Sequence, residues 1–125
     1  MSSRAKEIRK ALSEFEKKRK IGRGKSMVVG GAALHLHGLR PEVEDLDVVH
    51  PDLPSFERGP YGNFEVDAGP GGHLSEHSLR SERLHGVQTQ TLSSLLDFYQ
   101  NAPRMNRPKD QVWIELLKKK IAERG

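Results

Sequence analysis

Apolar residues recur at helical spacing through the first segment of the chain. Residues 3–20 carry them every third or fourth position, and Gly22 then breaks the pattern. The apolar positions are Ala5, Ile8, Leu12 and Phe15. The spacing predicts an amphipathic helix that covers one face of a sheet and ends in the basic run Lys17–Lys20, which complements the helix dipole.

Shorter apolar runs follow, and several alternate with polar residues as strands do. The pattern predicts strands at 27–29, 46–49, 63–68 and 87–89, a short helix ending at Gly38, a helix that begins near 91 and ends before Pro103, and a last helix from Pro108. The expected apolar positions of the last two helices are Leu92, Leu95, Leu96 and Tyr99, then Val112, Trp113, Leu116, Leu117 and Ile121. Residues 51–62 have the composition of a turn-rich connection.

These elements predict an α/β (α+β) fold with a small mixed β-sheet and flanking helices. The 125 residues suit one domain. Its parts are a basic amphipathic helix at 1–22, a core of sheet and candidate site at 26–90, and helices at 91–125.

Two carboxylates flank Leu46 at the start of a predicted strand. Side chains alternate along a strand, so Asp45 and Asp47 lie on one face, about 7 Å apart along the backbone. Oxygen ligands at this spacing suit a divalent cation. The next strand carries Glu65 and Asp67 on one face by the same alternation.

A Gly30-Gly31 turn precedes the short helix. A helix that begins there directs backbone N–H groups and its positive end at the space in front, which favours phosphate. A phosphate-binding turn beside paired carboxylates indicates a site for a nucleoside triphosphate.

The residues that form this pattern resemble a known signature. Val29-Gly30-Gly31, a spacer of thirteen residues and then Asp45-Leu46-Asp47-Val48 resemble the motif of the DNA polymerase β-like nucleotidyltransferase superfamily. The letters LHGLR at 36–40 resemble the bacterial and phage branch that includes AbiEii-type toxins. Gly86-Val87-Gln88-Thr89 and the predicted helix after it are similar to a strand and helix in that branch. Arg107-Pro108-Lys109-Asp110 is similar to the start of the helix that follows them there.

The resemblance implies transfer of a nucleoside monophosphate from a nucleoside triphosphate to a hydroxyl of an RNA, protein or small-molecule acceptor, in a toxin–antitoxin context. It implies that Asp45 and Asp47 hold Mg²⁺ (or Mn²⁺) and that Asp67 completes the metal site or acts as base, with Glu65 as the alternative. The implied nucleotide-binding residues are Gly30, Gly31, Arg40, Arg107 and Lys109. The resemblance departs at Gly31, where many relatives carry serine.

Charge is distributed unevenly along the chain. The net charge is +4, but residues 1–25 carry ten Lys/Arg against three Asp/Glu, residues 26–103 four against eleven, and residues 104–125 seven against three. An acidic centre between basic ends suits a polyanionic substrate.

The chain has no cysteine, which excludes disulfides and thiolate metal sites. It also lacks an apolar run of membrane length and a signal peptide, so we expect no membrane contact and a cytoplasmic location.

Other interpretations stay open. The chain can be a catalytically degenerate module that binds nucleotide or RNA through its basic ends together with a partner protein, or a metal-dependent nuclease. His73-Leu74-Ser75-Glu76-His77 matches the H-x-x-E-H pattern of zinc peptidases, but a short helix after a glycine-rich loop does not favour that site. His35 and His37 are interpreted as packing or surface residues. The acceptor, the preferred nucleotide and the oligomeric state are not determined by the sequence.

Overall fold

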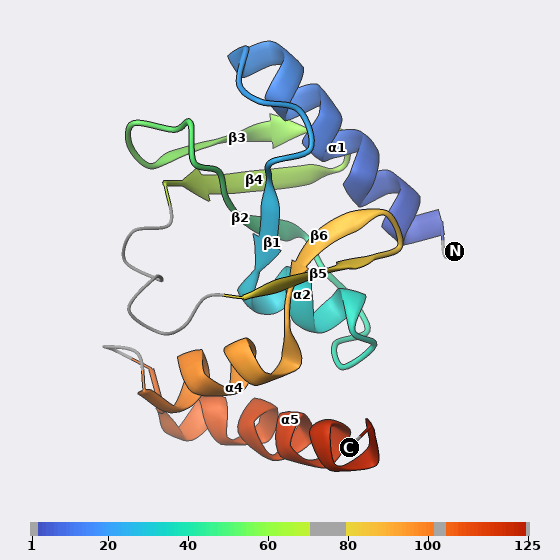
Figure 1. Cartoon of the computed structure of the whole chain (residues 1–125), viewed down its shortest axis with the longest axis vertical. Helices are drawn as coiled ribbons and strands as arrows, with labels where there is room; N and C mark the ends of the chain where they lie inside the picture. Colours follow the sequence, from blue (N-terminus) through green and yellow to red (C-terminus); the bar gives the residue numbers. More distant parts are fainter. Residues whose placement is uncertain (1–2, 71–79, 102–104, 125) are drawn as a thin grey trace.

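The computed structural model describes residues 3–70, 80–101 and 105–124. Within them, a six-stranded mixed sheet is flanked by four α-helices, which confirms the predicted small α+β architecture (Figure 1). The H-x-x-E-H pattern at 73–77 lies outside these residues. None of the described helices is both long and apolar enough to cross a membrane.

The elements follow the chain in the order that the hydrophobic pattern predicts, with two additional strands. They are α1 (Ser3–Arg19), β1 (Met27–Val29), α2 (Gly30–Leu36), β2 (Asp45–Val49), β3 (Glu57–Tyr61), β4 (Phe64–Gly69), β5 (Ser81–Leu84), β6 (Val87–Gln90), α4 (Leu92–Asn101), a 3-10 turn (Pro108–Asp110) and α5 (Gln111–Arg124). The strand order in the sheet is β3-β4-β2-β1-β6-β5.

The central strands present one apolar face and one mixed face. Leu46 and Val48 of β2 and Val66 of β4 are buried on the first face, as alternation predicts. Helix α1 covers this face: Phe15 packs edge-on against Tyr61, with ring centroids 5.2 Å apart, and the guanidinium of Arg4 lies 4.5 Å from the Phe64 ring centroid. The four predicted apolar positions of α1 are all buried. The opposite face carries Asp45 and Asp47 and faces the cavity described below.

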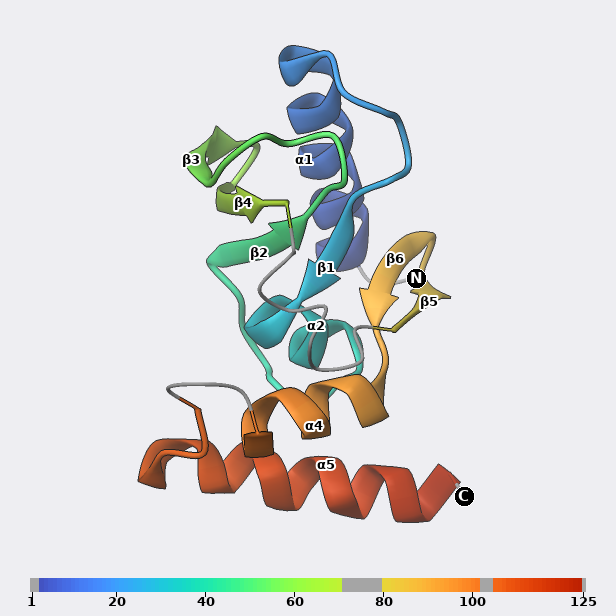
Figure 2. The same cartoon turned by 60° about the vertical axis from the view of Figure 1, so that its left-hand side comes forward.

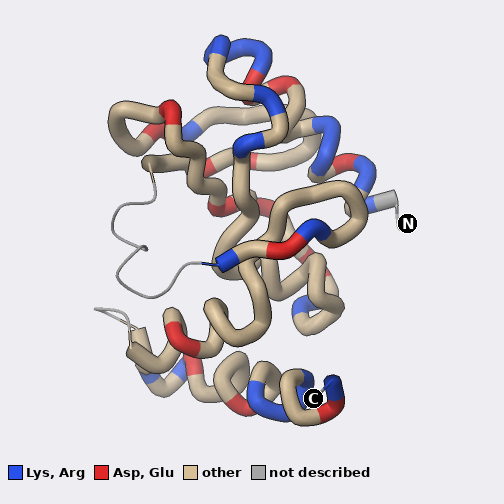
Figure 3. Tube along the Cα trace, viewed as in Figure 1, with Lys and Arg blue, Asp and Glu red and all other residues tan. Residues whose placement is uncertain are grey.

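Helix α1 and the pair of helices α4 and α5 lie toward opposite ends of the molecule. In Figures 1 and 2, α1 lies along the β3–β4 side, α4 and α5 pack together at the other end, and α2 lies between them and the sheet. Figure 3 places the basic end of α1 and the basic end of α5 far apart. The two basic segments therefore do not form one continuous surface around the acidic centre.

The prediction of a turn-rich connection at 51–62 is wrong for its second half, because β3 spans 57–61. This edge strand contains Pro60, which an edge tolerates because it needs no ladder hydrogen bond on its outer side. Strand β5 was not predicted either. It pairs with β6 through a two-residue turn, His85-Gly86, whose φ angles are +52° and +78°, as a type I′ turn requires.

The phase predicted for the last helix is partly wrong. Val112 is 59% exposed, whereas Ile114, which was not assigned to the apolar face, is 3% exposed. Residues two apart in a helix face different sides, so Ile114 of α5 points inward and Val112 outward, and Asp110 of the preceding turn is also buried. Leu117 is buried and Trp113 is half-buried, as expected for a helix that packs on α4.

Candidate active site

Three carboxylates lie side by side on the mixed face of the sheet. Strands β2 and β4 are parallel, and their register places Asp47 opposite Asp67 and Asp45 opposite Glu65. The same row continues to Arg58 on β3 and Val29 on β1. Since register partners share a face, the pairing brings Asp67 into the acidic group although it lies 20 residues after Asp47 in the chain.

Asp47 is the central carboxylate of this group. Burial, and after it the neighbouring charges of Asp67 and Asp45, raise the pKa of Asp47 to about 6. Arg40 and Arg58 oppose the shift. The site thus concentrates negative charge that a bound cation would relieve.

Arg58 sits at the outer border of the acidic group. Its Nη2 lies 3.6 Å from Asp45 Oδ1 and its Nε lies 3.4 Å from Glu65 Oε2. Glu65 is therefore held by Arg58, and it does not line the cavity that Asp45, Asp47 and Asp67 line. The geometry favours Asp67 over Glu65 as the third carboxylate.

The glycine turn joins β1 to α2 directly beside Asp47. Gly30 has φ +59°, which favours glycine, and a Cβ at this position would lie 3.3 Å from Asp47 Oδ2. The Gly30 N–H donates to the buried side-chain oxygen of Gln90 at 3.1 Å. This N–H is thus already bonded within the protein, and a phosphate would reach it only by displacing Gln90.

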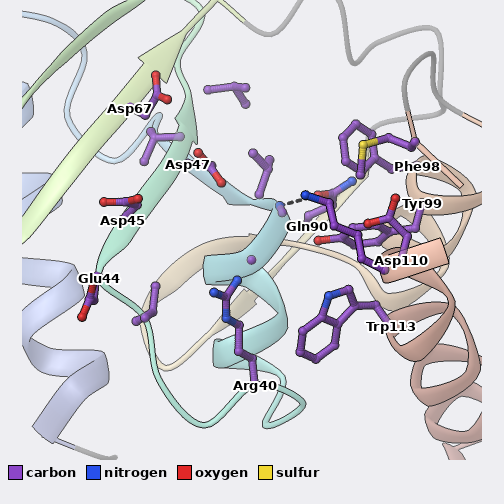
Figure 4. A pocket seen from close by; sticks show the side chains of 18 of the residues that line it. Arg40, Glu44, Asp45, Asp47, Asp67, Gln90, Phe98, Tyr99, Asp110 and Trp113 are labelled. Carbon is purple, nitrogen blue, oxygen red and sulfur yellow. Dashed lines mark hydrogen bonds between the residues drawn. The ribbon is translucent and has the colours of Figure 1, made fainter. Parts of the chain in front are cut away.

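The Arg40 side chain packs directly against Gly31. A Cβ on Gly31 would overlap with Nη1 of Arg40, and the Arg40 guanidinium carbon also lies 5.9 Å from the centroid of the Trp113 ring. Arg40 follows the short helix and reaches back over its start (Figure 4). At this position, where the resembled motif often carries serine, the guanidinium occupies the space that a side chain would need.

A cavity of about 970 Å³ connects these features. Its size lies at the upper end of the roughly 300–1,000 Å³ typical of ligand pockets. All the predicted site residues line it, namely Gly30, Gly31, Arg40, Asp45, Asp47, Asp67, Arg107 and Lys109. Figure 4 shows the carboxylates on one side and the aromatic side chains of α4 and α5 on the other.

Arg107 and Lys109 enter the cavity from the 3-10 turn before α5. Asp110 is 2% exposed and accepts hydrogen bonds from Arg107 Nε at 2.7 Å and Nη2 at 3.0 Å. Its side chain also caps the turn by accepting from the Arg107 N–H at 3.0 Å. These bonds lower the pKa of Asp110. Arg107 is therefore largely engaged by the protein, which leaves Arg40 and Lys109 as the better-placed phosphate contacts.

An aromatic wall closes the cavity opposite the carboxylates. Phe98 and Tyr99 on α4 meet edge-on with ring centroids 5.4 Å apart, and Trp113 and Met105 extend the wall. Burial raises the pKa of Tyr99 to about 12, so its hydroxyl stays neutral near pH 7. The helical spacing of apolar residues predicts Tyr99 and Trp113 as packing residues, and it predicts neither this wall nor the role of Gln90. The Arg107-Pro108-Lys109-Asp110 motif is the one sequence feature that points to this end of the cavity, and it includes Asp110.

His35 in α2 and His37 directly after it make hydrogen bonds to the backbone. His37 is 8% exposed, and its Nε2 lies 2.8 Å from the carbonyl oxygen of Gln90. Burial lowers the pKa of His37, so the neutral ring donates this bond. His35 Nδ1 bonds to the carbonyl oxygen of Arg40 at 2.8 Å, which fixes the start of the Arg40 loop. Both roles agree with the interpretation of these residues as packing groups.

The donor chemistry fits a hard cation that is shared with a ligand. Among the described residues, no three His, Cys, Asp or Glu side chains converge closely enough to hold a metal ion by themselves. Mg²⁺ is typically bound by one or two carboxylates together with waters and substrate phosphates. The oxygen donors of Asp45 and Asp47, with Asp67 beside them, suit that mode rather than a closed protein cage.

Comparisons with protein-family models, with curated proteins and with solved structures found no match to this chain.

Proposed function

We propose that the chain is a Mg²⁺-dependent nucleotidyltransferase that moves a nucleoside monophosphate from a nucleoside triphosphate to an acceptor hydroxyl. The observation that carries the proposal is the row formed by Asp47 and Asp67 in register on parallel strands, next to the Gly30-Gly31 turn and in one cavity with it. The resemblance of the Gly-Gly and Asp-Leu-Asp motifs to the nucleotidyltransferase signature supports the same function.

The two sides of the cavity suit the two ends of a nucleotide. Arg40 and Lys109 supply positive charge for phosphate oxygens, and the aromatic wall supplies surfaces on which a base can stack. The triphosphate would lie between the glycine turn and these cations. The α-phosphorus would then face the carboxylates, as transfer requires.

The chemical step needs positioning, charge stabilisation and a proton acceptor. Asp45 and Asp47 would hold Mg²⁺, which would neutralise negative charge on the phosphate oxygens. The acceptor oxygen forms a bond to the α-phosphorus, the bond to pyrophosphate breaks, and Asp67 takes the hydroxyl proton. Arg40 would stabilise the charge on the departing pyrophosphate.

Transfer of labelled nucleotide tests the proposal. We expect α-phosphate-labelled nucleoside triphosphate, Mg²⁺ and a mixture of cellular RNA and protein to yield covalently labelled acceptor, with release of pyrophosphate. The Asp45→Asn/Asp47→Asn variant should lose at least a hundredfold of this rate, while a Glu115→Gln/Glu123→Gln variant, altered on the distant α5 surface, keeps it. Equal labelling by the two variants would exclude the assigned site. RNA cleavage without any triphosphate would indicate a nuclease instead.

A second candidate is a binding module without catalysis. It is favoured by two observations: the Gly30 N–H is bonded to Gln90, and Arg107 is engaged by Asp110. Both groups would otherwise be available to phosphate. Nucleotide binding that depends on Arg40, together with no transfer to any acceptor fraction, would establish this candidate.

A further inference from the structure

The end of α1 and the loop after it form a dense positive surface. Residues 17–25, here called the basic segment, contain six Lys or Arg and no acidic residue, and all six side chains are exposed. They gather at one end of the molecule in Figure 3. They are Lys17, Lys18, Arg19, Lys20, Arg23 and Lys25. Such a surface binds polyanions through release of condensed counterions.

This basic segment is fixed to the connection between β2 and β3. The Gly22 N–H donates to Asp52 Oδ2 at 2.8 Å, and the buried His50 donates from Nε2 to the Gly22 carbonyl oxygen at 2.7 Å. Arg19 Nε donates to Glu57 Oε1 at 2.6 Å. The bonds span both ends of residues 50–57, so the basic segment keeps a defined position next to this connection.

The connection presents an exposed aromatic ring at the mouth of the cavity. Phe56 is 62% exposed and lines the cavity together with Asp67. Its ring lies on Gly69, where a Cβ would overlap with it. Gly69 and Asp67 are on the same face of β4, two residues apart. The ring is thus held beside the carboxylate that is proposed to receive the acceptor proton.

A further cation lies on the strand that starts beside this ring. Arg58 is two residues after Phe56 and 57% exposed, and it faces the same side of the sheet as Asp67. From the basic segment to the cavity, the surface therefore offers cations, then an aromatic ring, then a carboxylate. Stacking on aromatic rings combined with a positive track is the usual way in which proteins hold single-stranded nucleic acid.

From this arrangement we infer that the acceptor is the end of a single-stranded polynucleotide. Its backbone follows the basic segment and Arg58, its terminal base stacks on Phe56, and its terminal hydroxyl faces Asp67. This inference rests on the proposed function for the transfer step, but the basic segment and Phe56 are not among the residues assigned to the triphosphate, so strand binding can be measured apart from transfer.

Binding of a fluorescent 12-nucleotide single-stranded RNA, measured by anisotropy without nucleotide or metal, tests the surface. We expect Lys17→Gln/Lys18→Gln/Lys20→Gln to weaken binding at least tenfold and to flatten the dependence of log affinity on log salt concentration. Phe56→Ala should weaken binding about fivefold or more with an unchanged salt slope, because stacking releases no counterions. The matched controls are Lys118→Gln/Lys119→Gln on α5 and Val112→Ala, the other exposed large apolar residue described, and both should bind as the parent protein does.

Several results would overturn the inference: no binding of the RNA, equal loss in the α5 control, an unaltered affinity of Phe56→Ala, or equal affinity for a duplex of the same sequence. Circular dichroism of each variant separates loss of binding from loss of fold. The Asp45→Asn/Asp47→Asn variant distinguishes this inference from the proposed function. If this variant binds RNA normally and the parent protein transfers no nucleotide, the proposed nucleotidyltransferase function is wrong and the RNA-binding surface is supported. If the parent protein transfers nucleotide to a small molecule but does not bind RNA, the RNA-binding surface is wrong and the proposed function is supported.

Discussion

The guanidinium of Arg40 occupies the space into which a side chain at Gly31 would project. The pair links the loop after α2 to the turn before it, and Arg40 reaches the Trp113 ring from the same position. A methyl group at position 31 must move Arg40, although only the flexible end of that side chain is in its way.

Gly31→Ala should therefore reduce nucleotide affinity without reducing stability. An alanine in the first turn of a helix stabilises it by up to about 1 kcal/mol over glycine, so the thermal midpoint should stay or rise. Affinity for nucleoside triphosphate, measured by calorimetry, should fall by roughly three- to tenfold as Arg40 is displaced. Arg40→Gln should give a similar loss.

The double variant Gly31→Ala/Arg40→Gln tests whether the two residues act together. If Arg40 mediates the effect, the double variant should bind nearly as well as either single variant. Losses that simply add would show that Gly31 contributes through its backbone alone.

The raised pKa of Asp47 makes stability depend on pH in a defined direction. The folded protein binds this proton more tightly than the unfolded chain does, since the pKa rises from 3.8 to about 6. The contribution of Asp47 to stability is thus full below about pH 4 and is lost as the pH rises to 6. Asp47→Asn should be more stable than the parent protein at pH 7.5, by on the order of 1–2 kcal/mol after allowance for partial exposure.

Urea unfolding at pH 4.5 and pH 7.5 measures this effect, with the stability difference between variant and parent as the readout. The difference should grow with pH for Asp47→Asn and stay constant for Glu115→Gln, an exposed carboxylate on α5. A pH-independent difference for Asp47→Asn would show that the pKa of this carboxyl is near its ordinary value.

Strands that bury a face could be predicted from the sequence, whereas the edges of the sheet could not. β1, β2 and β4 appear where the alternation of Val28, Leu46 and Val66 places them, because each must bury that face. The edge strands β3 and β5 carry polar residues and Pro60, so their pattern is weak. Val112 was misplaced because the buried stripe of α5 runs through Ile114 and Leu117, and a residue two positions from Ile114 faces another side of the helix.

The candidate site shows the same division. The spacing of Asp45 and Asp47 needs only the alternation of one strand, so sequence alone places them together. Their pairing with Asp67 needs the parallel register of β2 and β4. Gln90 contacts Gly30, which lies 60 residues before it, and Arg58 contacts Asp45, which lies 13 residues before it. No local sequence pattern predicts such contacts. The function of these residues stays a proposal.

Arg58 should compete with a cation for the acidic group. It contacts Asp45 and Glu65 through charged atoms at 3.6 and 3.4 Å, so its removal leaves more negative potential at the site. Arg58→Gln should bind Mn²⁺ roughly three- to tenfold more tightly in a titration followed by electron paramagnetic resonance. Arg83→Gln on the far edge strand β5 is the matched control. Equal Mn²⁺ affinity in all three proteins would show that Arg58 is a screened surface charge without influence on the site.

The proposed function requires that one nucleoside triphosphate binds at Asp45 and Asp47 together with a divalent cation. The most direct measurement is calorimetric titration of ATP, CTP, GTP and UTP into the protein with and without Mg²⁺, beside the Asp45→Asn/Asp47→Asn variant. We expect at least one nucleotide to bind the parent protein only when Mg²⁺ is present, and the variant to bind none. Absence of binding to the parent protein, or equal binding to the variant, would contradict the claim.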